Sequence, residues 1–180
     1  SDPMQKKLLL VDASSSVFRA FFAIPALANS AGVPTNAALG FTTMLQKLLR
    51  ETRPDYVVVV WDSPGPKRRK AIYPAYKANR EPAPAELKRQ FALCRELCAA
   101  LGLRQFGSSR YEADDIIGTL TVLGQQSGQP VTIVSRDKDL TQLVSANDTY
   151  WDAVADVRYG YHDIEERFGV IPERMADFLA

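Results

Sequence analysis

The stretch YVVVVWD, residues 56–62, decides the fold class, because six consecutive apolar residues end there on an aspartate. Two shorter runs of the same character are LLLVD, residues 8–12, and VTIV, residues 131–134. All three are short, rich in branched side chains and free of regular polar alternation. This pattern is typical of strands that are buried on both faces, as in a parallel sheet.

Helical patterns separate these three runs. Their apolar residues recur at helical spacing, and a glycine or proline follows each pattern, which is how helices commonly end. The predicted helices cover residues 36–51, 84–101 and 111–126. Strands and helices in alternation predict an α/β fold with a mostly parallel sheet. Beyond residue 150 we predict a short hairpin or edge strands, then two short helices over residues 161–168 and 172–179.

The composition is that of an ordinary globular protein. The 180 residues are 46% hydrophobic and 24% charged, and 22 Lys and Arg against 21 Asp and Glu leave a net charge of +1. These values exclude a disordered tail or a fibrous repeat. We expect one domain over residues 4–180, with residues 1–3 added ahead of the natural start at Met4. No apolar run approaches the roughly 18 residues of a membrane span, so we expect no membrane partner.

Two cysteines, Cys94 and Cys98, lie four residues apart in a predicted helix. We interpret them as apolar core residues rather than as a disulfide or a metal pair, which fits a reducing compartment such as the cytoplasm. No Ser-His-Asp or Cys-His set is visible, and we expect the single histidine, His162, at the surface. Covalent catalysis therefore has no candidate nucleophile.

Carboxylates follow each of the apolar runs. Asp12 and Asp62 end the first two, and Asp137 and Asp139 come shortly after the third. In open α/β sheets, ligands bind outside the carboxyl ends of the strands, so these acids are expected at one rim. Any one of them alone could instead cap a helix or lie in a solvated loop.

A second acidic group, Glu112, Asp114 and Asp115, opens the helix predicted from residue 111. Acids in a first turn complement the helix dipole, but three in four residues exceed that need. Seven carboxylates at one rim cannot all stay ionised without a cation among them. Oxygen ligands without Cys or His favour Mg²⁺ or Mn²⁺ over Zn²⁺. Two such ions would suit the in-line attack of water on a phosphodiester.

A basic segment, residues 67–80, begins five residues after Asp62 and contains six cations, two tyrosines and no acid. Cations contact phosphates and aromatic rings stack on bases, so the segment is a candidate for binding single-stranded nucleic acid. A solvated basic face is the alternative interpretation. The residues concerned are Lys67, Arg68, Arg69, Lys70, Tyr73, Tyr76, Lys77 and Arg80.

Several stretches together resemble one family. They are LLLVDASSSVFRAFFA from Leu8, VVVVWDSPG from Val57, YPAYKANREPAPAEL from Tyr73, YEADDIIGTL from Tyr111 and VSRDKDLTQLV from Val134. In content and order they resemble the 5′-nuclease family, which comprises the 5′–3′ exonuclease domains of bacterial DNA polymerase I, their stand-alone relatives and flap endonucleases. The tail IEERFGVIPERMADFLA, from Ile164, is also similar, so the resemblance covers nearly the whole chain.

The resemblance implies a PIN-like α/β/α fold of three layers, with a helical arch of about residues 67–87 inserted beside the active site. It implies a metal-dependent nuclease that acts on DNA with a 5′ single-stranded end or flap and uses no small-molecule cofactor. The family's metal-site acids fall on the seven carboxylates above, and Asp137 is also expected to be catalytic. Its phosphate-contacting cations fall on Lys77 and Arg80, and its base-stacking aromatic falls on Phe18.

Two departures from the family keep an alternative open. The family usually continues beyond this point with two more metal-site aspartates and a C-terminal DNA-binding subdomain, which we expect to be absent here. Family members often have Thr-Phe-Arg where this chain has residues 67–69. This second departure concerns the detail of the arch, whereas the first leaves open the alternative of a fragment that binds metal and single strands with little cleavage.

Two other enzyme classes were considered. A haloacid-dehalogenase-type phosphatase also places an aspartate after its first strand, but it needs a second one two residues later, where this chain has Ser14. A PIN-type ribonuclease would use the same chemistry, although no residue stands out as a reader of the RNA 2′-hydroxyl.

Overall fold

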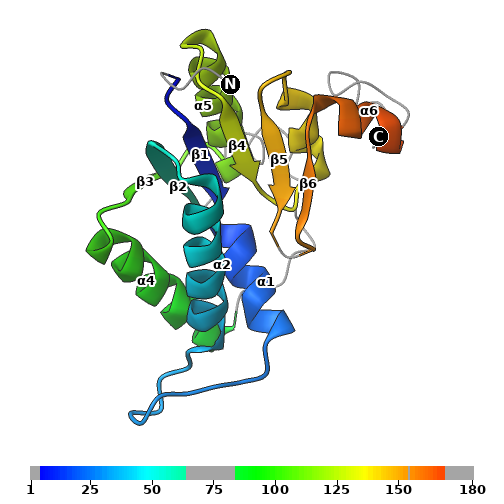
Figure 1. Cartoon of the computed structure of the whole chain (residues 1–180). Helices are drawn as coiled ribbons and strands as arrows, with labels where there is room; N and C mark the ends of the chain where they lie inside the picture. The colour runs from blue at the N-terminus through cyan, green and yellow to red at the C-terminus, as the bar shows by residue number, and fades with distance from the viewer. Residues whose placement is uncertain (1–4, 64–83, 154, 169–180) are drawn as a thin grey trace.

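A computed structural model describes residues 5–63, 84–153 and 155–168 of the chain. Its centre is one six-stranded sheet in the order β3-β2-β1-β4-β5-β6 (Figure 1). The strands are β1 (Leu8–Asp12), β2 (Tyr56–Asp62), β3 (Arg104–Ser108), β4 (Val131–Val134), β5 (Thr149–Asp152) and β6 (Val157–Tyr159). The first five strands run parallel, and β6 pairs antiparallel to β5. The predicted mostly parallel sheet is confirmed.

Helices cover both faces of the sheet. The helical elements are α1 (Ala13–Ala23), α2 (Asn36–Thr52), α4 (Ala85–Ala100), α5 (Ala113–Gln126), the 3₁₀ helix η1 (Lys138–Leu143) and α6 (Tyr161–Phe168). Figure 1 shows α1, α2 and α4 grouped together, with α5 apart from them. Each group packs on its own cluster of buried residues, so the expected α/β/α arrangement of three layers is confirmed.

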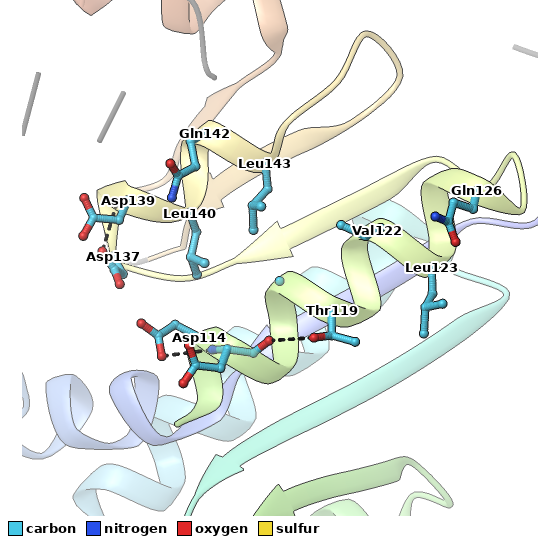
Figure 2. Close-up of a pocket in the computed structure, with 12 residues that line it drawn as sticks. Asp114, Thr119, Val122, Leu123, Gln126, Asp137, Asp139, Leu140, Gln142 and Leu143 are labelled. Atoms are coloured by element: carbon cyan, nitrogen blue, oxygen red, sulfur yellow. Dashed lines mark hydrogen bonds between the residues drawn. The ribbon is translucent and has the colours of Figure 1, made fainter. Parts of the chain in front are cut away.

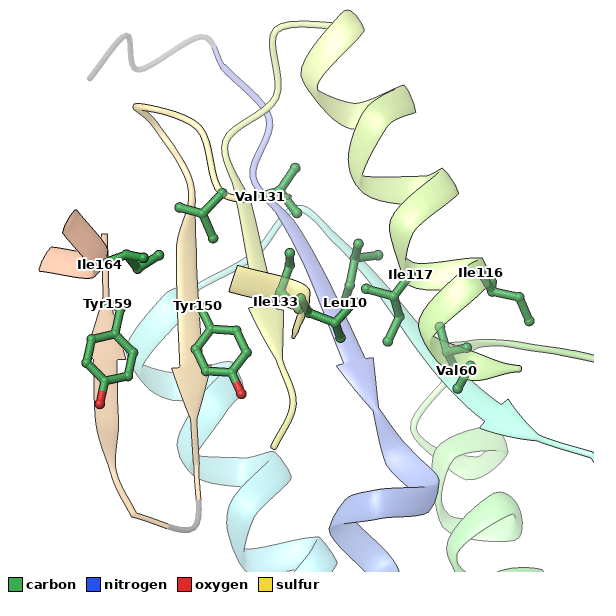
Figure 3. Close-up of a cluster of buried hydrophobic side chains, with 12 residues drawn as sticks. Leu10, Val60, Ile116, Ile117, Val131, Ile133, Tyr150, Tyr159 and Ile164 are labelled. Carbon is green, nitrogen blue, oxygen red and sulfur yellow. The ribbon is translucent and has the colours of Figure 1, made fainter. Parts of the chain in front are cut away.

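The strands alternate their side chains between these two layers. Leu9 and Val11 of β1 pack with Leu48 of α2, whereas Leu10 faces the other way and packs with Ile117 of α5 (Figure 3). Successive side chains of a strand point to opposite faces, so a strand covered on both sides needs an unbroken apolar run. Burying each such leucine contributes about 2 kcal/mol, which explains why the sequence signal was strong.

Most elements fall where the sequence placed them. The three long predicted helices correspond to α2, α4 and α5, and the predicted hairpin near residue 150 is the pair β5 and β6. Cys94 and Cys98 are buried free thiols, as expected. The expected arch and the second tail helix, residues 172–179, lie outside the described residues apart from the first turn of α4. Of the helices that the structure describes, none has the length and apolar content to cross a bilayer.

Three elements were not predicted, namely β3, α1 and the 3₁₀ helix η1. β3 has the sequence RQFGS and lies at the sheet edge, where it has no need of an apolar run. α1 contains three consecutive serines in its first turn, residues 14–16, which hide its helical spacing. Two of these serines, Ser15 and Ser16, donate their hydroxyl hydrogens back to the carbonyl oxygen of Asp12, at 3.2 and 2.9 Å.

Candidate metal centre

The carboxyl ends of β1, β2 and β4 form one acidic rim on the α5 side of the sheet. Asp12 ends β1, two residues beyond Leu10, and so shares the face on which Leu10 packs. Asp62 ends β2, two residues beyond Val60, and faces the same way. The start of α5 and the loop from β4 into η1 bring the remaining acids to this rim. The seven predicted carboxylates therefore lie along this rim, and among the described residues Glu112, Asp114 and Asp115 are the three that lie close enough together to form a compact group of possible ligands.

Asp12 is the most buried of the strand-end acids, with 7% of its surface exposed. Its Oδ2 accepts a hydrogen bond from the hydroxyl of Ser135 at 3.0 Å, whereas its Oδ1 is buried and has no hydrogen-bond partner. Burial, and to a lesser extent the nearby charge of Asp62, raise the pKa of Asp12 to about 6, although the neighbouring Ser15 and Ser135 lower it. A carboxylate in this state lacks a positive partner.

Asp62 joins three elements of the fold. Its Oδ1 accepts a hydrogen bond from the backbone N–H of Ala113 at 2.7 Å, at the start of α5. Its own backbone N–H donates to the hydroxyl of Ser14 at 2.9 Å, in the first turn of α1. These two bonds fix the end of β2 relative to both helical layers.

Glu112, Asp114 and Asp115 form a compact group at the start of α5. Each offers a carboxylate oxygen, and these oxygens all lie within 4.8 Å of one another. Asp115 accepts from the backbone N–H of Glu112 at 3.3 Å, as one half of a capping box, and Asp114 accepts from the N–H of Asp115 at 3.0 Å. The capping box uses the carboxylates of both Glu112 and Asp115, and it leaves Asp114 outside the capping role.

Asp137 and Asp139 face this group from η1. The hydroxyl of Ser135 accepts from the backbone N–H of Asp137 at 3.0 Å, and Asp137 caps η1 by accepting from the N–H of Asp139 at 3.0 Å. A pocket of about 620 Å³ lies between α5 and η1. Figure 2 shows Asp137 and Asp139 on one side of it and Asp114 on the other. Asp12, Asp62 and Glu112 do not line this pocket; Asp12 and Glu112 are buried, and Asp62 is half-buried.

This donor set fits a hard divalent cation. All seven side chains offer oxygen, and a buried oxygen of Asp12 is left without any hydrogen bond. A cation would both satisfy that oxygen and reverse the rise in the Asp12 pKa. The structural alternative, a set of capping acids, explains Glu112, Asp115 and Asp137 but gives no account of Asp12.

Of the residues predicted to contact nucleic acid, the structure describes only Phe18. Phe18 lies on α1 with 49% of its surface exposed, and its ring is 4.8 Å from that of Phe22. It is therefore open to a stacking partner, as its expected role requires. All eight cations and tyrosines of the basic segment, including Lys77 and Arg80, lie outside the described residues.

Sequence reasoning missed the two serines that hold the acids. Ser14 binds the backbone of Asp62, and Ser135 bridges the Asp12 side chain to the backbone of Asp137. Ser135 directly follows β4, and the pairing of Val11 with Val134 places it beside Asp12. Only the strand register reveals that relation, so no signal in the sequence alone could have found it.

Comparison with known proteins identifies the family. Residues 7–169 match the family described as 5′-3′ exonuclease, N-terminal resolvase-like domain. The chain belongs to this exonuclease family. It is a family of nuclease hydrolases, and the resemblance inferred from the sequence motifs is confirmed.

Two relatives show how much of the family's length this chain represents. DNA polymerase I of Bacillus caldotenax is 42% identical over 178 residues, which cover 97% of this chain and 20% of the polymerase. A 5′-3′ exonuclease of Aquifex aeolicus is 42% identical over 175 residues, which cover 97% of this chain and 61% of that protein. The chain thus spans about a fifth of the polymerase relative and less than two thirds of the exonuclease.

Solved structures of exonuclease and flap-nuclease type share the fold. T5 5′-exonuclease with divalent zinc ions bound has a TM-score of 0.70 at 19% identity, covering 94% of this chain and 64% of that one. The catalytic core of Rad2 in complex with a DNA substrate has a TM-score of 0.55 at 17% identity, covering 96% and 53%. At such identities the likeness establishes the three-layer fold of the exonuclease family in this chain.

Proposed function

We propose that residues 4–180 are the catalytic domain of a divalent-metal-dependent 5′-nuclease that hydrolyses DNA phosphodiesters near a 5′ single-stranded end or flap. The observation that carries the proposal is the buried Asp12 carboxylate, whose Oδ1 has no partner at a rim where six further acids converge. Membership of the exonuclease family supports it. Two structural relatives also support it, one with divalent zinc ions bound and one in complex with a DNA substrate.

The metal ions of this proposal are Mg²⁺ or Mn²⁺, two of them, held by the carboxylates of the rim. Such ions supply a water of lowered pKa and neutralise charge on the phosphate when bound. The proposed ligands are Asp12, Asp62, Glu112, Asp114, Asp115, Asp137 and Asp139.

The chain's own groups keep this rim in place before any substrate arrives. Ser135 and the backbone N–H of Ala113 each bind one oxygen of a strand-end acid, which fixes that carboxylate's rotamer. Groups fixed in this way need no reorganisation when charge develops in the transition state. Burial of Asp12 adds to the effect by weakening the competition from water.

The substrate contacts of the proposal come from α1 and the basic segment. Lys77 and Arg80 would neutralise charge on the scissile phosphate, and Phe18, exposed on α1, would stack on a base near the cut. The other cations and tyrosines of residues 67–76 would hold the single strand. We propose the cytoplasm as the compartment, since both cysteines are buried free thiols.

The test is cleavage of a 5′-labelled flap DNA by this chain with Mg²⁺, with Mn²⁺ and with EDTA. We expect metal-dependent product, reduced at least about a hundredfold in Asp137→Ala, because even loss of an outer partner of a metal site costs about 10–100-fold. Glu96→Gln, which removes an exposed acid of α4 outside the rim, is the matched control and should cleave normally.

The outcomes separate the two readings of the chain. Full activity in Asp137→Ala would remove that residue from the proposed site. Absence of product, together with binding of single strands that weakens steeply with salt, would instead support a metal- and strand-binding fragment.

A further inference from the structure

The end of β5 continues the acidic rim by one more strand. Val11 pairs with Val134, and Val134 pairs with Trp151, so the next residues along form one row across the sheet. That row contains Asp12, Ser135 and Asp152. Asp152 is 9% exposed and belongs to neither the predicted acids nor the lining of the pocket.

Tyr150 lies one step behind Asp152 on the same face of β5. Its ring is completely buried in the cluster on the α5 side, where it stacks on Tyr159 at 6.2 Å and 25°. Figure 3 shows its hydroxyl pointing along β5 toward the carboxyl end of the strand, which is the end where the rim lies. The ring belongs to the core, but the hydroxyl is directed at the acids.

The electrostatic surroundings of the hydroxyl agree with that direction. Burial is the largest cause that raises the pKa of Tyr150 above its ordinary value, and nearby negative charges raise it further. Those charges belong to Asp152, Asp137 and Asp12. The ammonium of Lys138 lies 5.8 Å from the ring centroid, over the ring rather than at the hydroxyl.

Two buried side-chain atoms lack a hydrogen-bond partner in the part of the chain that the structure describes; one belongs to this row, and the other lies one step behind it on the same face. They are Asp12 Oδ1, an acceptor, and the Tyr150 hydroxyl, a donor and acceptor. A buried polar atom without a partner costs free energy, and phenylalanine would fill the core at position 150 without that cost. Two such atoms on the same side of the rim indicate that a small polar molecule, such as a water, binds between the strand ends. Buried waters typically bind two to four polar groups.

We propose that the Tyr150 hydroxyl is a positioning group of the metal centre, which binds a water of the hydrated cation held at the rim and so extends the site across β4 to β5. This inference rests on the proposed function. Asp152, the next residue on that face of β5, adds a further carboxylate at the edge of the extended site. Tyr150 acts through the water and the carboxylates, so it does not touch the scissile phosphate.

The opposing interpretation is that Tyr150 is a core residue whose hydroxyl has no role. The two interpretations predict different metal affinities for one conservative variant. Tyr150→Phe keeps the ring and its contact with Tyr159 and removes one oxygen. If the hydroxyl has no role, the variant gains stability and binds metal as before. If it positions the bound water, the variant keeps or gains metal-free stability and binds metal more weakly.

The experiment measures Mn²⁺ affinity by titration calorimetry and the Tm in EDTA for the wild-type chain and for Tyr150→Phe. We expect the Kd for Mn²⁺ to rise about tenfold, the lower range for loss of an outer partner of a metal site, with the EDTA Tm equal to or above that of the wild type. Tyr56→Phe is the control, because Tyr56 is exposed at the opposite end of β2, and its affinity should not change.

Each outcome decides a separate question. Equal Mn²⁺ affinity in Tyr150→Phe and the wild type overturns this inference and leaves the proposed function intact. Absence of Mn²⁺ binding in the wild type overturns the proposed function and this inference with it. A lower EDTA Tm in Tyr150→Phe would show that the hydroxyl has a partner within the protein, which also overturns the inference.

Discussion

Two buried aspartates at opposite ends of the sheet have opposite surroundings. Asp148, just before β5 at the amino ends of the strands, is 3% exposed and accepts four hydrogen bonds. Its donors are Gln125 Nε2, the N–H of Val131, and both the N–H and hydroxyl of Ser145. Asp12, at the carboxyl ends, is 7% exposed, and one of its oxygens has no partner at all.

The difference teaches that burial of an acid does not by itself indicate function. Asp148 ties the end of α5 and the start of β4 to the loop before β5, and its hydrogen bonds account for it fully. The chain leaves Asp12 incompletely bonded, which costs folding free energy and reserves an oxygen for something the protein does not itself supply. Whether both carboxylate oxygens accept hydrogen bonds, rather than how deeply the side chain is buried, distinguishes the structural acid Asp148 from the candidate ligand Asp12.

The variant that tests this difference between Asp12 and Asp148 most strongly is Asp12→Asn. We expect metal-dependent cleavage to fall by at least about a hundredfold, since the variant loses a proposed metal ligand. The metal-free Tm should stay the same or rise, because the amide carries no buried charge. Cleavage of flap DNA and thermal unfolding in EDTA measure the two quantities. A large loss of Tm would show that Asp12 is as structural as Asp148.

The reciprocal change is Asp148→Asn. An amide NH₂ in place of the oxygen that accepts from Gln125 and Ser145 would face their donors, so we expect the free energy of unfolding to fall by about 3 kcal/mol. Urea unfolding of the two variants side by side measures it. Cleavage activity per folded molecule should be retained. Loss of activity in well-folded Asp148→Asn would contradict the assignment of Asp148 as a purely structural acid.

The smallest expected effect is a pH dependence that belongs to Asp12. Its folded-state pKa is about 6, against an ordinary value of 3.8, so between these values the folded chain binds more protons than the unfolded one. The free energy of unfolding therefore falls as pH rises through this window, by about 2 kcal/mol between about pH 4.5 and 7. Urea unfolding in EDTA at both pH values tests this.

Asp12→Asn isolates that contribution from other titrating groups. The variant lacks the carboxyl group, so its loss of stability over the same pH interval should be smaller than that of the wild type by the same amount. Parallel pH profiles for the two chains would show that Asp12 does not titrate in this window.

The sequence predicted those parts of the molecule whose signal is local. The runs that became β1, β2 and β4 must be apolar throughout because both of their faces are covered, and the aspartates that end β1 and β2 are apparent in the sequence. β3 escaped prediction because an edge strand with exposed residues carries no such run. The roles of Ser135 and Tyr150 depend on which residues the strand register sets side by side, and one chain read alone does not reveal a register.

The order of the strands has a consequence that no single residue determines. From β1 the chain proceeds through β2 to β3 on one side, with its crossovers on the α1, α2 and α4 face. It then returns through α5 on the other face to β4, on the far side of β1. The boundary between β1 and β4 is thus a topological switch point, where the segments that leave neighbouring strands diverge to opposite faces and open a crevice. Asp12 and Ser135 stand at that boundary, so the chain's winding order, rather than any single side chain, places the ends of β1 and β4 where the helical segments part.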